Sequence, residues 1–342
     1  MKNILELGKA IVLAKITKKK IPLYVSLSVT SRCNSNCLYC SVIKKKTQEM
    51  TTEQILKLIE DMYKSGTRWL SFNGGEALLR KDIDILVNFA KKKGMFVSLF
   101  SNGYLVPQKI DLIRKLDCLV LSFDGKKEHH DLTRGKGSYD KVMRAILLVK
   151  SVTNIKLLTN TVITKYNLCD IDFILETAKC YGFFCKFNIL YKSDENAQHV
   201  TRIIPTNGEY SDIIEKLIKE KRKGAPIVLS FKALKYMLDW EDFRTYYMTQ
   251  KNKNKNKNKN KFKCLGGKLF CYIDTDGTVS PCIISKKFIK PLSCMGLGFE
   301  TAFLNTSHLS CQECLYSACL GYNSMLSLDT NTILSGLQLL LK

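Results

Sequence analysis

Residues 23–40 read LYVSLSVTSRCNSNCLYC, a short apolar run that leads directly into three closely spaced cysteines. The run from Leu23 to Val29 is rich in apolar and β-branched residues, which predicts a buried strand. Cys33, Cys37 and Cys40 follow in the spacing C-x3-C-x2-C. Because functional residues of α/β folds gather where strands end and loops begin, this stretch predicts a three-thiol site at the end of the first strand.

The same pattern of short β-rich run and amphipathic helix recurs along the chain. The predicted strands are Leu23 to Val29, Trp69 to Asn73, Phe96 to Ser101, Cys118 to Phe123, Lys156 to Val162 and Phe184 to Leu190. The predicted helices are Thr52 to Ser65, Asp82 to Lys93, Pro107 to Lys115, Tyr139 to Val152 and Leu168 to Tyr181. The alternation indicates an α/β fold with a parallel sheet, either open and doubly wound or closed as a complete or partial TIM-type barrel. No G-x-G-x-x-G follows the first strand, which weakens the dinucleotide-binding interpretation.

Composition limits the class of protein. The 342 residues carry 54 Lys and Arg against 31 Asp and Glu, a net charge of +23, and 14 cysteines. Seven of the lysines lie in the Lys/Asn tract from Lys251 to Lys263, which is typical of a solvated, disordered linker, so the charge says little about partners. Glu6, Lys9 and Lys15 interrupt the N-terminal apolar run, so no signal peptide is expected. The sequence predicts a cytoplasmic protein whose clustered cysteines hold metals rather than disulfides.

Three thiolates can hold three corners of a tetrahedral site, but a closed zinc site or a fully protected cubane needs four. The segment from Ser31 to Cys40 resembles the radical S-adenosylmethionine (SAM) superfamily, with Tyr39 at that family's aromatic position. The resemblance implies that Cys33, Cys37 and Cys40 bind a [4Fe-4S] cluster with one open iron, which SAM chelates. It also implies that an electron from the cluster cleaves SAM to a 5′-deoxyadenosyl radical, which abstracts hydrogen from a substrate.

Motifs similar to those of the same family end the next three predicted strands. They are Asn73-Gly74-Gly75-Glu76, with Ala77 in place of the family's proline, then Ser101-Asn102-Gly103, then Ser122-Phe123-Asp124-Gly125. His130, Arg134, Gly135, Gly137 and Ser138 are similar to the family's H-x-x-x-R-G-x-G-S stretch. The resemblance implies SAM contacts from Tyr39, Gly74, Gly75, Glu76, Asn102, Ser122 and Asp124. It names no catalytic base, and His129 and His130 on their own indicate surface or capping residues.

Half of the cysteines lie between Phe262 and Gly321. A turn from Asp274 to Gly277 separates two runs and predicts a strand pair, Leu269 to Ile273 with Thr278 to Ile284. The cysteine spacing resembles the SPASM and Twitch extensions of the superfamily, which implies one auxiliary [4Fe-4S] cluster. Its expected ligands are Cys264, Cys282, Cys311 and Cys314, with Cys319 or Cys271 as candidate replacements. A structural zinc site fits the same spacing. Cys118, Cys169, Cys180, Cys185 and Cys294 are expected to be buried thiols.

Four segments are expected. Residues 1–20 form an amphipathic N-terminal helix, 21–192 a partial (β/α)6 TIM-type barrel of the radical SAM type, 193–261 a helical linker with the disordered Lys/Asn tract, and 262–342 a small SPASM/Twitch-like iron–sulfur domain with a C-terminal helix. The N-terminal helix is expected either to pack across the open edge of the barrel or to make a peripheral contact with an anionic membrane.

The resemblance implies a radical SAM oxidoreductase or maturase whose substrate is a peptide or protein. Its electron donor would be a flavodoxin or ferredoxin. Modification of a small molecule or a nucleic acid is the alternative within the enzyme class, although nucleic acid is not favoured as a partner. The rival of another class is a non-enzymatic zinc or nucleic-acid-binding protein.

Overall fold

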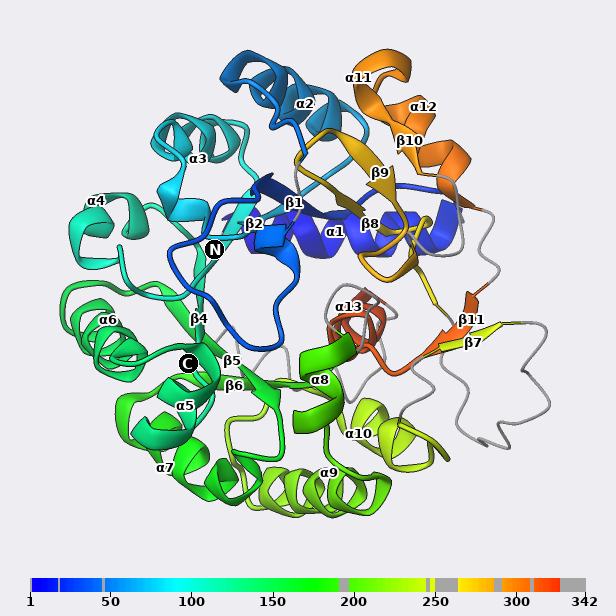
Figure 1. Ribbon diagram of the computed structural model, residues 1–342. Helices are drawn as coiled ribbons and strands as arrows, with labels where there is room; N and C mark the ends of the chain where they lie inside the picture. Colours follow the sequence, from blue (N-terminus) through cyan, green and yellow to red (C-terminus); the bar gives the residue numbers. More distant parts are fainter. Residues whose placement is uncertain are drawn as a thin grey trace.

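The computed structural model describes residues 2–17, 19–44, 47–190, 197–243, 247–249, 264–285, 291–307 and 311–326. Six parallel strands follow one another in chain order and form the curved sheet at the centre of Figure 1: β1 (Tyr24–Thr30), β2 (Trp69–Gly74), β3 (Phe96–Ser101), β4 (Cys118–Ser122), β5 (Lys156–Ile163) and β6 (Phe184–Ile189). The helices between them lie outside the sheet: α2 (Thr52–Lys64), α3 (Ile83–Lys92), α4 (Ile110–Ile113), α5 (Lys127–Arg134), α6 (Ser138–Val152) and α7 (Ile171–Tyr181). The predicted partial TIM-type barrel is confirmed, and α5 is an element that the periodicity did not predict.

Alternation along the strands decides which side chains reach the interior of the barrel. Val25, Leu27 and Val29 of β1 point outward and are buried with the apolar faces of the helices. Ser26, between them, faces the interior and accepts a hydrogen bond from the Asn73 amide of β2. The interior near the carboxyl ends of the strands is therefore polar, which is where a ligand is expected in such folds.

The N-terminal helix α1 (Lys2–Thr17) packs against the barrel. Its residues Leu7, Ile11 and Ala14 are buried in one cluster with Leu23 and Phe270. The helix thus packs at the amino ends of β1 and β8 and not across the open edge of the barrel, and a peripheral membrane contact stays a prediction. No helix in the described part of the chain is long and apolar enough to cross a membrane.

The C-terminal part of the chain extends the barrel sheet. Strand β8 (Phe270–Ile273) pairs in parallel with β1, and β9 (Thr278–Ser280) and β10 (Leu292–Ser293) follow antiparallel at the edge. The predicted hairpin is present, but its attachment to β1 was not predicted.

Further short elements surround the remaining side of the barrel. They are α8 (Ala197–Ile203), α9 (Asn207–Arg222), α10 (Phe231–Leu238), α11 (Cys294–Leu297), α12 (Phe299–Leu304), the strand pair β7 (Tyr247–Thr249) and β11 (Cys311–Cys314), and α13 (Ser317–Leu326). Helix α13 lies between β8 on one side and α8 and α10 on the other (Figure 1), and it also contacts β6. The gap between β1 and β6 is thus covered by the cysteine-containing C-terminal segment.

Candidate functional site

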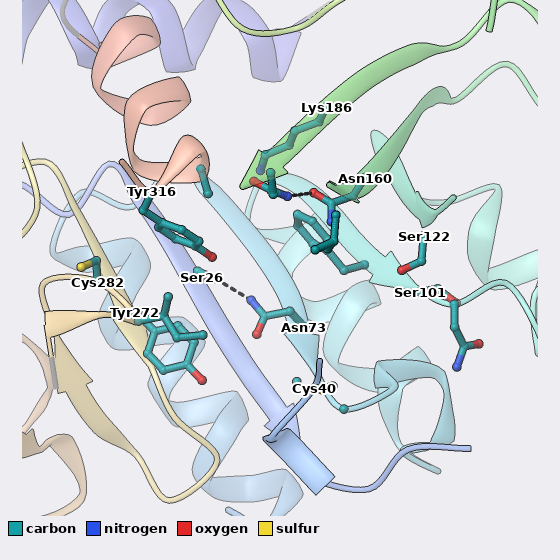
Figure 2. A pocket seen from close by; sticks show the side chains of 18 of the residues that line it. Ser26, Cys40, Asn73, Ser101, Ser122, Asn160, Lys186, Tyr272, Cys282 and Tyr316 are labelled. Carbon is teal, nitrogen blue, oxygen red and sulfur yellow. Dashed lines mark hydrogen bonds between the residues drawn. The ribbon is translucent and has the colours of Figure 1, made fainter. Parts of the chain in front are cut away.

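A cavity of about 300 Å³ lies inside the barrel near the carboxyl ends of the strands. Side chains from β1 to β6, from the cysteine loop and from the C-terminal segment line it. In Figure 2, Tyr272, Cys282 and Tyr316 lie across the cavity from Ser101 and Ser122, with Cys40 between the two groups. One cavity therefore joins the two cysteine-containing regions of the sequence.

The cysteine loop presents three partly exposed thiols to this cavity, those of Cys33, Cys37 and Cys40. The Ser35 hydroxyl lies 3.3 Å from Cys37 Sγ, and the Cys40 backbone N–H donates to the Cys37 carbonyl at 3.1 Å. Burial raises the pKa of Cys33 to about 11. Three soft donors on one short loop fit an iron–sulfur cluster that keeps one iron for another ligand.

Two glycines let the loop after β2 approach the cysteine loop closely. Gly74 has φ +133°, and a Cβ there would lie 2.2 Å from the Thr30 carbonyl oxygen. A Cβ on Gly75 would lie 2.2 Å from the carbonyl oxygen of Arg32, and the Gly75 N–H donates to the Thr30 carbonyl at 2.7 Å. Both glycines line the cavity, and in this structure they also hold the cysteine loop against β2.

Glu76 connects the ends of β2 and β3. It is buried, and its two oxygens accept from the backbone N–H groups of Leu78 at 3.2 Å and Asn102 at 2.7 Å. Burial raises the pKa of its carboxyl group. The Asn102 amide in turn donates to Asn34 Oδ1 at 2.7 Å and lies 3.9 Å from Cys33 Sγ. Glu76 lies behind the cavity wall, and its contact with SAM remains a prediction.

A buried ion pair supports the other side of the cysteine loop. Arg134 donates to Asp124 from Nε at 2.6 Å, and its Nη1 lies 3.9 Å from Cys37 Sγ. The Tyr39 hydroxyl also donates to Asp124, at 2.7 Å. Burial would raise the pKa of Asp124, but the Arg134 guanidinium and the hydrogen bonds hold it below its usual value. His130 Nδ1 accepts from the Asp124 N–H at 3.1 Å, and burial lowers its pKa to about 4.

The predicted SAM shell thus divides into two groups. Tyr39, Gly74, Gly75, Asn102 and Ser122 line the cavity. Glu76 and Asp124 are buried behind the cavity wall, where they bind Asn102 and Tyr39 and hold these two cavity-lining residues in position.

The thiols of the C-terminal segment gather on the opposite wall. Cys319 is buried and hydrogen-bonds Cys282 and Cys314, and Cys264 interacts electrostatically with the same two thiols. The hydrogen bond from Cys319 lowers the pKa of Cys282 to about 7. The thiols of Cys264, Cys282, Cys314 and Cys319 therefore fit the ligand set of a second iron–sulfur cluster. The side chain of Cys311 lies outside the described part of the chain.

Residues 27–178 match the model of the radical SAM superfamily. These residues form a domain of this superfamily. The chain is 32% identical over 173 residues to Fe-coproporphyrin III synthase of Methanosarcina barkeri, a match that covers 48% of this chain but only 42% of the relative. It is 26% identical over 291 residues to AdoMet-dependent heme synthase of the same organism, with 78% of each chain covered.

The structure also resembles that of SuiB from Streptococcus suis bound to the precursor peptide SuiA. The TM-score is 0.65 at 14% identity, and the match covers 94% of this chain and 76% of SuiB. At this identity the likeness shows a shared fold.

One further feature of the site was missed in the sequence. Lys186 of β6 lines the cavity, with Nζ 5.3 Å from the Tyr322 ring centre and 5.5 Å from that of Phe100. The available signal was a lysine inside an otherwise buried strand. Cys271, a candidate replacement ligand, is buried near Cys294 and also lines the cavity, and its role as a ligand stays a prediction.

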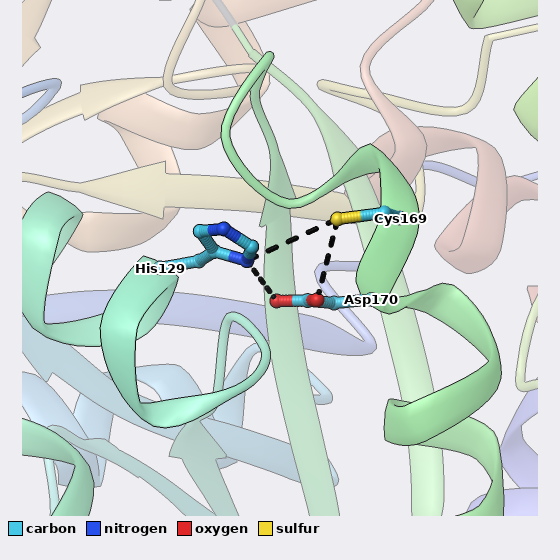
Figure 3. Close-up of side chains that lie close together, drawn as sticks. All are labelled: His129, Cys169 and Asp170. Carbon is cyan, nitrogen blue, oxygen red and sulfur yellow. Dashed lines mark hydrogen bonds and ion pairs between the residues drawn. The ribbon is translucent and has the colours of Figure 1, made fainter.

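The expectation that Cys169 and Cys180 are buried is wrong, because both are exposed. Cys180 lies on the outer face of α7, and Cys169 lies in the short 3-10 helix just before it, beside His129 and Asp170 (Figure 3). His129 Nδ1 is 2.8 Å from Asp170 Oδ2, which also accepts from the Lys126 N–H at 2.9 Å. The buried Asp170 carboxylate thus ties the loop after β4 to the loop after β5.

Proposed function

We propose that this radical SAM enzyme binds a [4Fe-4S] cluster through Cys33, Cys37 and Cys40 and modifies a peptide or protein. When bound, the cluster and SAM supply a 5′-deoxyadenosyl radical that abstracts hydrogen from the substrate. The convergence of three thiols and the ends of β1 to β4 on one cavity carries the proposal.

The chain's own residues would position and shield this chemistry. Arg134 Nη1 lies 3.9 Å from Cys37 Sγ, and its Nε donates to the buried Asp124, so the ion pair holds this part of the cysteine loop in place. Asn102 reaches both the Asn34 side chain and Cys33, so the end of β3 holds the cysteine loop. Tyr316 of the C-terminal segment lines the opposite wall and limits access of water.

An auxiliary cluster held by Cys264, Cys282, Cys314 and Cys319 is part of the proposal. Their mutual hydrogen bonds and charge interactions support the set. Four thiolates also suit zinc, so the metal has to be identified by analysis.

Peptide modification is supported by the fold shared with SuiB, whose structure includes its precursor peptide. A small-molecule substrate is the second candidate, because the heme synthase relative matches over 78% of each chain. A flavodoxin or ferredoxin is proposed as electron donor.

Anaerobic purification, metal analysis and SAM turnover test the proposal. We expect about eight irons per chain and SAM cleavage after reduction with dithionite. Cys37→Ala should lose about four irons and all cleavage, whereas the control Cys180→Ala, at an exposed thiol outside both sets, should match wild type. A colourless, zinc-loaded protein that leaves SAM intact would refute the proposal. Candidate peptides and porphyrins are then compared by the 5′-deoxyadenosine that they elicit above the background.

A further inference from the structure

Lys186 is a buried amine that points into the barrel. Its neighbours in β6, Cys185 and Phe187, point to the opposite face of the strand and are buried in the core between the sheet and the helices. Only 9% of its surface is exposed, and the side chain lines the cavity (Figure 2). Its ammonium group lies over the rings of Phe100 and Tyr322. Aromatic faces attract a cation but do not neutralise it.

No carboxylate pairs with this amine within the described part of the chain. The residues that line the cavity include the cations Lys186 and Arg134 and no Asp or Glu. Arg134 is paired with Asp124, at 2.6 Å. Among the described residues, the Lys186 amine has no hydrogen-bond acceptor and no salt bridge. An unpaired charge is costly to bury, so an anion that enters the cavity would gain the interaction that the fold leaves unmade.

A second donor stands beside Lys186. Asn160 of β5 is the register partner of Lys186 and also lines the cavity. The Asn188 amide donates to the Asn160 side-chain oxygen, and the Ser317 hydroxyl donates to Asn188. This chain of bonds fixes the orientation of Asn160 and leaves its NH2 group for a ligand. An ammonium and an amide N–H side by side suit the two oxygens of a carboxylate.

We propose that Lys186 and Asn160 bind a carboxylate group of the substrate. The inference rests on the proposed function, because it takes this cavity as the place where the substrate binds. A carboxylate could come from an acidic residue of a peptide or from a small organic acid, and the two sources share this recognition.

The auxiliary thiols offer a competing role for the same lysine. Cys319 interacts electrostatically with Lys186, although no hydrogen bond joins the two groups. If Lys186 serves as the counter-charge of a metal cluster there, its removal would change the reduction potential of that cluster and leave carboxylate binding unchanged.

Equilibrium dialysis of labelled propionate against the cluster-loaded, SAM-bound protein tests the inference. Wild type should bind one propionate per chain, and propionamide should compete at least about tenfold more weakly, because a hydrogen bond between charged groups is lost. Lys186→Met should weaken propionate by at least about tenfold. Lys221→Met is the matched control, because Lys221 is half-buried, its Nζ lies 5.5 Å from the Phe231 ring centre and it does not line this cavity.

A second binding experiment distinguishes a peptide carboxylate from a small organic acid. If acetyl-Gly-Glu-Gly-amide binds more tightly than both propionate and the corresponding Gln peptide, the carboxylate belongs to a peptide. If propionate binds more tightly than acetyl-Gly-Glu-Gly-amide, the carboxylate belongs to a small organic acid. Equal binding of propionate and propionamide to wild type overturns the inference even if Lys186→Met does not fold. An unchanged propionate affinity in Lys186→Met, with a shifted potential of the auxiliary cluster, also overturns it. If the wild-type protein cleaves SAM but does not bind propionate as expected, the proposed function stands and only this inference fails. If propionate binding depends on Lys186 but the protein does not cleave SAM, only the proposed function is refuted.

Discussion

Replacing Asp124 with asparagine tests the ion pair that supports the three-cysteine loop. Asp124 is fully buried, and one oxygen accepts from Arg134 Nε at 2.6 Å and the Tyr39 hydroxyl at 2.7 Å. The other accepts from Arg134 Nη2 at 3.3 Å and the Val162 backbone N–H at 2.8 Å. In either orientation, the NH2 group of an asparagine would face two donors and leave a buried guanidinium without a counter-charge.

Breaking one partner of a buried ion pair costs about 3–5 kcal/mol of unfolding free energy. The entropy of unfolding is about 2.1 cal/mol/K per residue, so for this chain the cost corresponds to a fall of about 4–7 °C in Tm. Because Tyr39 and Arg134 also lose their anchor, the cysteine loop should hold its cluster less well. We expect fewer irons per chain together with the lower Tm.

Anaerobic thermal unfolding of the cluster-loaded proteins measures the first effect, and iron analysis measures the second. Asp140→Asn is the control, because that carboxylate is exposed and pairs with Lys127 at the surface, where ion pairs contribute little. The double variant Asp124→Leu, Arg134→Leu should recover Tm, since it removes both buried charges, but not SAM cleavage. Equal Tm values and iron contents in Asp124→Asn and Asp140→Asn would refute the reasoning.

Three further outcomes are expected. Gly75→Ala should lose most of the iron of the first cluster, since its Cβ would meet backbone at 2.2 Å, whereas Gly208→Ala, which has open space, should not. Because the folded pKa of His130 is about 4 against 6.5 unfolded, the unfolded chain binds more protons between these values. Unfolding free energy should therefore fall by about 2 kcal/mol from pH 7.5 to pH 5, but not in His130→Asn, as followed by Tm. Cys319→Ser should lose about four irons and keep the first cluster, whereas an equal loss in Cys271→Ser would contradict the ligand set.

The parallel strands could be predicted because each one carries its own local pattern of apolar and β-branched residues. All six predicted strands overlap observed ones, and the predicted Phe96 to Ser101 matches β3 (Phe96–Ser101) residue for residue. Three cysteines on one loop are likewise a local pattern. Local spacing was enough to bring these thiols together, because they and the strand end that presents them lie within a few residues of each other.

The auxiliary thiols were harder because they meet through long-range contacts. Spacing favoured Cys311 and left Cys319 as a replacement, but Cys319 is on α13, which packs against β6 and α10. That packing brings its thiol to Cys282 and Cys314. Lys186 was missed because a lysine inside an otherwise buried strand does not by itself show whether that position faces an apolar layer or a ligand cavity.

The register between β8 and β1 sets the spacing of the two thiol groups. Tyr24 pairs with Phe270 and Leu27 with Ile273, so the hairpin that leads to Cys282 is fixed to the strand that ends at the cysteine loop. A slip of two residues would keep the same faces buried and yet shift Cys282 by roughly 7 Å along β1. Tyr24 resists such a slip, because its hydroxyl donates to Tyr322 of α13 at 2.7 Å and its ring packs on Trp69. The distance across the cavity between the two groups of thiols is therefore determined by the pairing of β8 with β1.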